Sequence, residues 1–462
     1  MFRLAESRLE REVMKFEEAL QYMEGRLRFG WKLGNDRVER ICEQLGNPQW
    51  TYPVIHIAGT KGKGSTTALC ASILRSAGYK VGSYFSPYVY DVRERVQIDG
   101  QYIPREAFGQ MIAELRPYVD AFDDSELGPV TEFELKTLLA FLWFAHEKVD
   151  IAVIEVGLGG RLDATNIVRP IVTAITNIGL DHTQILGDTP ALIAAEKAGI
   201  LKQGIPAFTA SANREALQVI ERIAGERSVP LAYVRKGNAD TPTKDPKEVY
   251  WQIAPKESPP LAPVNIATEQ QVYSRVQVSL TGEYQRENAA LAVALAEKSI
   301  ERMGGTLSSK AVSQGLAQIR LPGRFEVLAL PNNITVVLDG AHNGMAAEAL
   351  AGALEAFPAR RTLLVMGMLT GHEPEGVLQA LCPRATRLYT CAPQWKRAFP
   401  VAELTSKAKT FMRDVTSHES VPLAVQSALR DAKTGDLILI TGSFYTVGEA
   451  SPHNITSWYD SL

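Results

Sequence analysis

Two successive alternations of short apolar runs and helical patterns organise this chain. From about Pro53 onward, the apolar runs VIHIA, KVGSYF, IAVIEV, IVTAITNI and IPAFTA are separated by helical stretches such as STTALCASILRSA. Such an alternation is typical of βαβ units, in which helices cover both faces of a parallel sheet. We therefore predict an α/β domain built on a mostly parallel sheet.

A second alternation begins near residue 320. The runs ITVVLD, TLLVMG, RLYTC and DLILIT are separated by a helical pattern from Gly344 and another near residues 420–433. The length of 462 residues also exceeds the usual size of one domain. We predict two domains: residues 1–318, which include N-terminal helices, and residues 319–462, a smaller Rossmann-like α/β domain.

Three segments depart from the strand and helix alternation. The sequence RVQIDGQYI is typical of a hairpin that turns at Asp99-Gly100. Residues 236–263 are rich in Pro, Lys and Asp without a sustained period, so we expect an exposed insertion there. Helical patterns at residues 286–303 and 308–318 precede the second alternation.

The composition narrows the classes of partner. A formal net charge of -3, with 22% charged residues, gives no overall field that would favour nucleic acid or an anionic membrane. The four cysteines are scattered without a CxxC pair, which suits a reducing compartment. The longest apolar run, residues 138–145, is too short to span a bilayer, and the N-terminus lacks the apolar core of a signal peptide. We expect a cytoplasmic protein that binds small molecules.

A glycine-rich loop follows the run VIHIA and leads directly into a helical pattern. Its three glycines let backbone amides crowd around an anion, and the helix N-terminus adds a partial positive charge. Lys63 can reach terminal phosphates, and the hydroxyl of Ser65 can ligate magnesium. The strict P-loop pattern fails at Ile57 and Gly64, so the hydroxyl comes one place later. We predict a P-loop-type site for a triphosphate with Mg²⁺, formed by Gly59, Thr60, Gly62, Lys63, Gly64, Ser65 and Thr66.

Polar residues follow the next two apolar runs. The run IAVIE ends in Glu155 before a glycine-rich stretch, and the run IVTAITNI leads to His182; Lys197 lies in the helical pattern after it. Ligands in open α/β sheets bind at the carboxyl ends of the strands, and magnesium prefers hard oxygen ligands. A structural cap explains Glu155 equally well by itself, and Lys197 would ordinarily be a solvated charge. His182 at the same edge as the phosphate loop favours a metal or polar role.

The motifs HIAGTKGKGST, FSPYVYDVRERV, TEFELKTLLAF, IEVGLGGRLDATN, GLDHTQILG, EKAGI, GEYQRENA, LPGRF, DGAHN and TGSFY occur in this order. Together they resemble the folylpolyglutamate synthase and dihydrofolate synthase family of the Mur ligase superfamily, over nearly the whole chain. The resemblance implies an ATP-dependent amide ligase. ATP would phosphorylate a folate-type carboxylate to an acyl phosphate, and the amino group of L-glutamate would then attack it and expel phosphate.

The resemblance also implies the roles of residues near the phosphate loop. Lys63 would hold the ATP phosphates. Ser65 and Ser86, with Glu155, would bind one Mg²⁺, and Glu155, His182 and Lys197 would serve a second. The family's lysine that matches Lys197 is carbamylated, which turns a cation into an anionic oxygen ligand.

Further roles are implied for residues later in the chain. Gln285 and Asn288 match the nucleotide-contacting motif GxHQxxNA, although Tyr284 replaces its usual histidine. In the second domain, Arg324 and Asp339 match residues that reach ATP, and His342 and Ser443 match residues placed near glutamate. The implied catalytic residues are Lys63, Glu155, His182, Lys197 and His342. The family's frequent DKD is here Gly371-His372-Glu373, to which no role is assigned.

Alternative functions remain open at this point. A Mur-type cell-wall ligase would carry a whole N-terminal domain before the phosphate loop, whereas only helical segments precede Pro53. A nucleotide-binding switch would not need the DGAHN and TGSFY motifs, and an inactive paralogue would not need the complete set of site residues.

Dihydropteroate and a reduced folate are both possible acceptors. Phe133, Glu134 and Arg161 lie in motifs near the pterin side, but packing and local ion pairing explain them equally well. Family members are commonly monomers, so we expect a monomer.

Overall fold

The computed structural model describes residues 14–30, 34–254, 262–355, 357 and 359–461. The chain forms two compact units. The first unit comprises Met1–Pro87, Arg93–Tyr233 and Leu291–Ser308, and the second comprises Tyr88–Val92, Val234–Ala290 and Ser309–Leu462. The expected N-terminal helix lies partly outside the described residues. In the described part, no helix combines the length and apolar character needed to cross a membrane.

Eleven strands form the larger sheet, in the order β11-β10-β9-β8-β7-β6-β1-β5-β2-β3-β4. Strands β1, β2, β5, β6 and β7 pair in parallel, as does β8 with β7. The predicted mostly parallel sheet is therefore confirmed. Its strands are β1 (Val54–Ala58), β2 (Val81–Tyr84), β3 (Val96–Ile98), β4 (Gln101–Tyr102), β5 (Ile151–Glu155), β6 (Pro170–Ile175), β7 (Ala207–Thr209), β8 (Leu231–Lys236), β9 (Glu248–Ile253), β10 (Val264–Ala267) and β11 (Val272–Val276).

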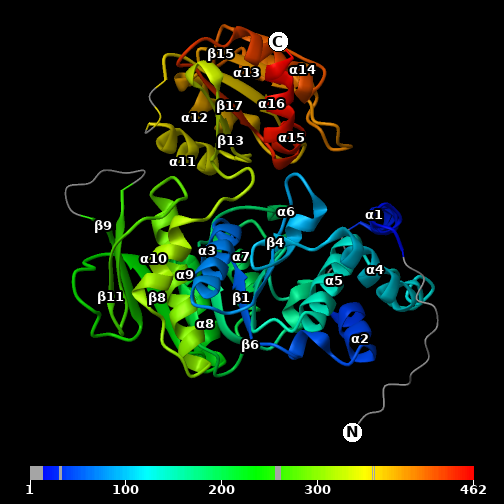
Figure 1. Ribbon diagram of the computed structural model, residues 1–462, viewed down its shortest axis with the longest axis vertical. Coiled ribbons are helices and arrows are strands. Elements are labelled where there is room, and N and C mark those ends of the chain that lie inside the picture. The colour runs from blue at the N-terminus through cyan, green and yellow to red at the C-terminus, as the bar shows by residue number, and fades with distance from the viewer. Residues whose placement is uncertain (1–13, 31–33, 255–261, 356, 358, 462) are drawn as a thin grey trace. The chain divides into compact units, whose positions relative to one another are not determined.

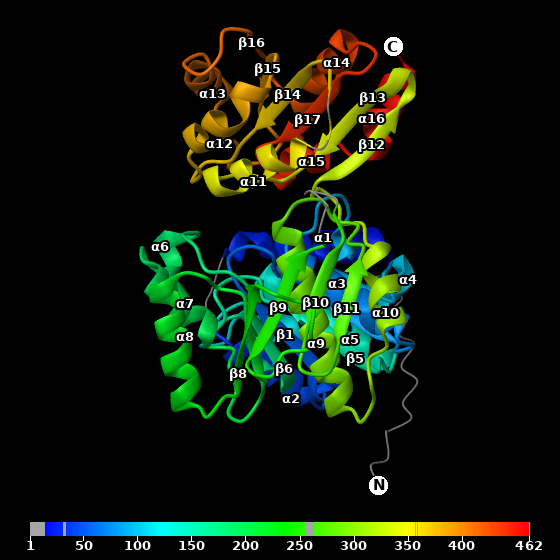
Figure 2. The ribbon, with the colours of Figure 1, turned by 90° about the vertical axis from the view of Figure 1, so that its left-hand side faces the viewer.

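Helices of the first unit cover this sheet. Helix α3 packs on β1, β5 and β2, and α7 and α8 share an apolar core with β6 and β7. Figure 2 shows α6, α7 and α8 together on one side of the strands, and Figure 1 shows α1, α4 and α5 as a separate group. The helices up to this point are α1 (Phe16–Gly25), α2 (Asp36–Gln44), α3 (Lys63–Ser76), α4 (Arg105–Asp120), α5 (Glu132–His146), α6 (Thr183–Leu186), α7 (Pro190–Ala198) and α8 (Arg214–Glu226).

At the ends of the sheet, the structure confirms the expected hairpin and contradicts part of the expected insertion. The hairpin at Asp99-Gly100 is confirmed, because β3 and β4 pair antiparallel across it. The insertion expected at residues 236–263 is wrong in part, because Glu248–Ile253 forms strand β9 and pairs with β10. The reason is local: Val249 and Trp251 are both buried, so the period of two is present, but the strand is only six residues long. Residues 255–261 of that segment lie outside the described residues.

The smaller sheet has six strands in the order β12-β13-β17-β14-β15-β16. All neighbours pair in parallel except β12 and β13. The second α/β fold predicted from the sequence is therefore confirmed. Its strands are β12 (Glu326–Leu330), β13 (Ile334–Leu338), β14 (Thr362–Gly367), β15 (Arg387–Cys391), β16 (Val415–Ser417) and β17 (Leu437–Thr441).

Helices cover both faces of the smaller sheet (Figure 2). Side chains of α11, α12 and α13 form one apolar core with the sheet, and those of α14, α15 and α16 form another on the opposite face. Strand β17 is buried along its whole length, as expected for a central parallel strand. The remaining helices are α9 (Tyr284–Arg302), α10 (Ser309–Ala317), α11 (Gly344–Leu354), α12 (Pro374–Leu381), α13 (Val401–Ala408), α14 (Val421–Asp431), α15 (Phe444–Glu449) and α16 (Pro452–Asp460).

Short 3-10 helices complete the secondary structure. They connect the longer elements or extend their ends. Their bounds are η1 (Arg26–Phe29), η2 (Pro48–Trp50), η3 (Val92–Arg95), η4 (Ala164–Ile167), η5 (Pro331–Asn333) and η6 (Cys382–Arg384).

Candidate active site

The phosphate loop connects the buried strand β1 to helix α3. At Gly59, φ is 148°, and a Cβ there would lie 1.7 Å from Thr176 Oγ1, so only glycine fits this position. Lys63 begins α3, and its Nζ donates to the carbonyl oxygens of Gly59 at 3.0 Å and Thr60 at 3.4 Å. The lysine side chain therefore folds back over the loop, beside the N-terminus of helix α3. This arrangement suits a phosphate group.

Segments after strand β6 hold the loop in place. Thr176 Oγ1 donates to the Lys61 carbonyl at 2.7 Å, and the Lys61 amide donates to Asn177 Oδ1 at 2.9 Å. The ammonium group of Lys61 lies 3.0 Å from Asp181 Oδ2. Sequence reasoning missed Thr176, Asn177 and Asp181 as supports of the loop. Their positions directly after a strand parallel to β1 are the signal that could have indicated them.

Glu155 ends strand β5, which is paired with β1 such that Glu155 lies opposite Ile57. Its side chain is only 2% exposed, and its Oε2 accepts a hydrogen bond from the Ser86 amide at 3.0 Å. The structure thus brings together two of the residues predicted to bind magnesium. The Ser86 contact shown is made by the backbone, so the role of its hydroxyl stays a prediction.

Lys197 lies in the last turn of α7, and its side chain is 4% exposed. Burial lowers the pKa of Lys197 to about 7, and the charge of Lys63 adds to this effect. Burial also lowers the pKa of His182, with a further contribution from the charge of Lys63. Because the charge of Lys63 lowers the pKa of both Lys197 and His182, the three side chains lie close enough to interact electrostatically. His182 itself has a φ of 51° and occupies the N-cap position of α6 without a side-chain capping hydrogen bond, and its side chain is 44% exposed.

The glycine-rich stretch after Glu155 packs closely against the end of α7. A Cβ at Gly160 would lie 2.9 Å from the carbonyl oxygens of Glu196 and Lys197, so this contact requires glycine. The buried carboxylate of Asp163 closes the stretch by accepting from the Leu158 amide at 2.8 Å and the Thr165 amide at 3.0 Å. Asp163 was not singled out from the sequence, although an Asp two residues before a Thr is a common turn signal.

A buried histidine connects this stretch to the strand before the phosphate loop. His56 in β1 is fully buried, and its Nε2 lies 2.9 Å from Thr165 Oγ1. Burial lowers the pKa of His56 from 6.5 to about 3, with a smaller contribution from Lys202. His56 is therefore neutral in the folded chain throughout the physiological range.

The depressed pKa of His56 predicts a loss of stability in acid. Below pH 6.5 the unfolded chain binds a proton at His56 that the folded chain does not bind, until the pH approaches 3. We expect His56→Gln to remove this contribution, so that wild type loses about 2 kcal/mol more than the variant between pH 7 and pH 5. Urea unfolding at both pH values measures the difference. Parallel pH profiles for the two proteins would contradict it.

Local interactions account for the polar residues of two other motifs. Glu134 Oε1 accepts from Arg37 Nε at 2.8 Å, and Arg161 pairs with Glu196 at 2.8 Å. The ring of Phe133 lies against Gly157 and 6.4 Å from the ring of Tyr84. Packing and ion pairing, one of the two interpretations left open by the sequence, are therefore present; a role toward a pterin remains a prediction.

In the second unit, the predicted nucleotide residues at the start of α9 form a buried pair. Asn288 Nδ2 donates to Gln285 Oε1 at 2.9 Å. Between them, Arg286 is 1% exposed and donates to the carbonyl oxygens of Leu280, Gly282 and Ala262. Sequence analysis missed this arginine, which fixes the loop that precedes the helix.

Arg324 and Asp339 flank the antiparallel pair β12 and β13. Asp339 Oδ2 accepts from the Phe325 amide at 2.8 Å and Oδ1 from the Ala341 amide at 2.9 Å. Burial raises the pKa of Asp339 to about 6, an effect that these two amides oppose. The guanidinium carbon of Arg324 lies 5.1 Å from the centre of the Phe444 ring. The structure thus places Arg324 beside the start of α15, and Asp339 within electrostatic reach of Arg324.

His342 and Ser443 follow strands β13 and β17, at the carboxyl edge of the smaller sheet. His342 Nδ1 lies 2.8 Å from the Gly340 carbonyl oxygen. Ser443 is 3% exposed, and its hydroxyl accepts from the Thr446 amide at 3.0 Å as the cap of α15. His372, in the loop after β14, places its ring 4.7 Å from that of His342. Sequence analysis assigned no role to His372, because Gly371-His372-Glu373 departs from the family's DKD; the contact with His342 joins loops thirty residues apart.

The predicted magnesium ligands fit a metal only under one condition. In the described residues, no three His, Cys, Asp or Glu side chains gather as a cage. The predicted set instead relies on Glu155, His182, two serines and Lys197. An ammonium group cannot ligate a cation, but Lys197 is buried and has a pKa of about 7, and its side chain makes no hydrogen bond or ion pair with another described residue. A carboxylate added to this amine would supply the missing oxygen ligands.

Comparison with known proteins identifies the family. Residues 57–296 match the Mur ligase middle domain, and residues 323–444 match the Mur ligase glutamate ligase domain. The dihydrofolate synthase/folylpolyglutamate synthase of Bacillus subtilis is 35% identical over 94% of this chain and 98% of its own length.

Two solved structures have the same fold. That of Escherichia coli FolC in complex with DHPP and ADP has a TM-score of 0.81 and 32% identity, and covers 94% of this chain and 96% of that one. That of Mycobacterium tuberculosis folylpolyglutamate synthase with ADP has a TM-score of 0.83 and 30% identity, covering 94% and 98%. The chain therefore belongs to the folylpolyglutamate synthase and dihydrofolate synthase family of Mur ligases.

Proposed function

We propose that this protein is an ATP-dependent ligase that joins L-glutamate to the carboxylate of a folate, and that dihydropteroate is a second acceptor. The observation that carries the proposal is the convergence of a phosphate loop, Glu155 and the buried Lys197 at one edge of the larger sheet. The proposal is also supported by similarity over nearly the full length to an enzyme that is named for both activities. The proposed reaction passes through an acyl phosphate, and its products are the amide, ADP and phosphate.

In this reaction, the chain's own residues position phosphate groups and neutralise their charge. Lys63 exchanges the loop carbonyls for phosphate oxygens, and the α3 amides bind the same oxygens. Glu155, Ser65, Ser86, His182 and carbamylated Lys197 would hold magnesium. When bound, magnesium neutralises charge on the transferred phosphoryl group. No protein nucleophile is required, because the acceptor carboxylate attacks ATP directly.

Residues of the second unit complete the proposal. Gln285, Asn288, Arg324 and Asp339 act on the nucleotide, and His342 and Ser443 act on glutamate. We further propose a domain boundary at residues 318/319, supported by the two separate sheets and the two family matches. A cytoplasmic location and a monomeric state complete the proposal, the first supported by the scattered cysteines and the second by family resemblance.

Phosphate release tests the function directly. Purified protein is assayed with ATP, Mg²⁺ and L-glutamate, with dihydropteroate, tetrahydrofolate or a UDP-linked peptide as acceptor. We expect acceptor- and glutamate-dependent release with one or both pterins. Release only with the UDP-linked peptide would indicate a Mur-type ligase, and no release with any acceptor would overturn the proposal.

His372 provides a test of the glutamate site. Because its ring lies 4.7 Å from that of His342, we expect His372→Ala to loosen the site and raise KM for glutamate about tenfold, a loss of about 1.4 kcal/mol. KM for ATP should remain unchanged. The matched control is His453→Ala, since His453 is an exposed histidine on α16. Equal KM values for the two variants would remove His372 from the glutamate site.

A further inference from the structure

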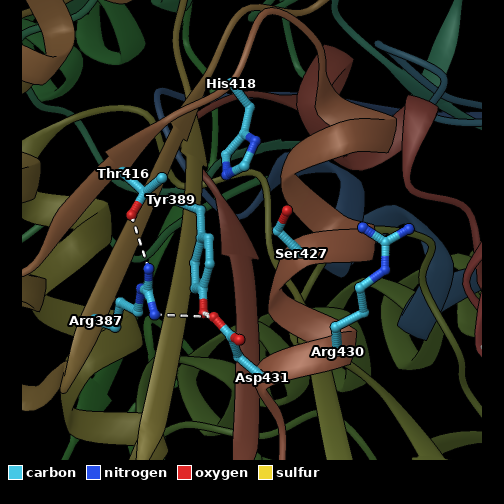
Figure 3. Close-up of a pocket in the computed structure, with 7 residues that line it drawn as sticks. All are labelled: Arg387, Tyr389, Thr416, His418, Ser427, Arg430 and Asp431. Carbon is cyan, nitrogen blue, oxygen red and sulfur yellow. Dashed lines mark hydrogen bonds and ion pairs between the residues drawn. The ribbon is translucent and has the colours of Figure 1, made fainter.

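A polar cavity of about 130 Å³ lies in the second unit, between β15, the end of β16 and α14. Arg387 is the first residue of β15 and Tyr389 lies in its middle, whereas His342 and Ser443 follow the ends of β13 and β17. The cavity is therefore a separate feature of the smaller sheet. Its lining consists of Arg387, Tyr389, Thr416, His418, Ser427, Arg430 and Asp431 (Figure 3).

Arg387, Tyr389, Thr416 and Asp431 contact one another within the cavity lining. Asp431 Oδ2 accepts from the Tyr389 hydroxyl at 2.7 Å and lies 3.0 Å from Arg387 Nη1. Arg387 Nη2 donates to Thr416 Oγ1 at 3.0 Å, and its Nε lies 3.4 Å from Asp414 Oδ1. Two carboxylates therefore balance the charge of Arg387, although its Nε makes no hydrogen bond in the described structure.

The other lining residues, His418, Ser427 and Arg430, carry polar groups that have no hydrogen-bond partner among the described residues. His418 packs on the Tyr389 ring with 6.0 Å between ring centres, and its Nε2 is buried without a hydrogen-bond partner. Neither the Ser427 nor the Arg430 side chain makes a hydrogen bond or ion pair with any other residue that the structure describes. These two residues lie three positions apart on α14 and so share one face of the helix. Figure 3 shows the Arg430 guanidinium directed away from Asp431.

The Ser427 hydroxyl, the Arg430 guanidinium and a protonated His418 Nε2 can all donate hydrogen bonds, which suits a ligand with several acceptor atoms. A guanidinium presents paired N–H groups that match phosphate oxygens, and buried polar nitrogens are rarely left without a partner. The cavity volume corresponds to about four waters, which is sufficient for one phosphate group. We propose that this cavity binds a small oxyanion, either inorganic phosphate or the phosphate of a monoester, through Arg430, Ser427 and His418. The inference does not rest on the proposed ligase function.

Histidine-ring NMR of the full chain tests the site. The chain has seven histidines, and the signal absent from His418→Gln identifies His418. Inorganic phosphate and glycerol phosphate are titrated separately at constant ionic strength. We expect at least one of them to shift the His418 signal saturably. A shift with inorganic phosphate alone would indicate a site for free phosphate, and a shift with glycerol phosphate would indicate that a phosphate monoester also binds.

Arginine variants separate binding at the cavity from binding elsewhere. Arg430→Ala should weaken phosphate affinity, measured by the shift of the His418 signal, at least about tenfold. Arg430→Lys keeps the positive charge but lacks the paired N–H groups of the guanidinium, so its affinity should lie between those of wild type and Arg430→Ala. The exposed Arg413→Ala is the matched control and should behave as wild type. No shift with either phosphate, an equal shift with sodium chloride, or equal affinity in Arg430→Ala would each overturn the proposal.

Discussion

Replacing Lys63 with alanine is expected to lower phosphate release on the order of 10³-fold or more while leaving the fold intact. The Nζ of Lys63 lies over the loop, 3.0 Å from the Gly59 carbonyl oxygen, where it is poised to contact a terminal phosphate. Phosphoryl transfer depends on positioning and charge neutralisation, so losing this cation removes stabilisation made mainly in the transition state. The assay is glutamate-dependent phosphate release at saturating ATP, with circular dichroism to check the fold.

Lys61→Ala is the matched control for this experiment. Lys61 lies in the same loop, but its ammonium group is 3.0 Å from Asp181, and the loop is held chiefly by contacts of the Lys61 backbone. We expect Lys61→Ala to reduce phosphate release by roughly tenfold at most, because an ion pair in contact with solvent contributes little free energy. Similar losses in both variants would indicate loop disruption, and near-wild-type turnover in Lys63→Ala would remove Lys63 from the site.

Local signals explain why much of the fold was predictable. Strand β1, the glycine loop and α3 follow one another without interruption, so the apolar run, the glycines and the helical pattern all lie within 23 residues. The same holds for β13, β14, β15 and β17, whose apolar runs are bounded by polar turns. Strand β9 was missed because its alternation is short and surrounded by Pro, Lys and Asp.

The candidate site was predictable only where a motif is contiguous. The sequence indicates the phosphate loop, but not that Thr176 lies beside Gly59, because that contact joins residues more than a hundred positions apart. The same limit applies to Asp163 with Leu158 and to His372 with His342. Burial is equally non-local: the sequence presents Lys197 as a surface charge, and only the packing of α7 makes it 4% exposed.

Lys197 is expected to carry a carbamate, and Lys197→Ala is expected to lose activity about 10³-fold. A neutral amine reacts with carbon dioxide to form the carbamate and release one proton. Burial lowers the pKa of Lys197 from 10.5 to about 7, so about half of this amine is neutral at pH 7. As the pH falls below 7, the amine becomes protonated, and both the carbamate and the activity should decline together.

Lys136 is an internal control for the modification. Its pKa is also lowered to about 7 by burial, but its ammonium group pairs with Glu132, whereas Lys197 has no such partner among the described residues. We expect ¹³C-bicarbonate to label Lys197 and not Lys136, and the label to be absent from Lys197→Ala. Chemical trapping followed by peptide mass spectrometry locates it. If neither lysine is labelled while the enzyme turns over, Lys197 acts without a carbamate; if Lys197→Ala is fully active, it is not a metal ligand at all.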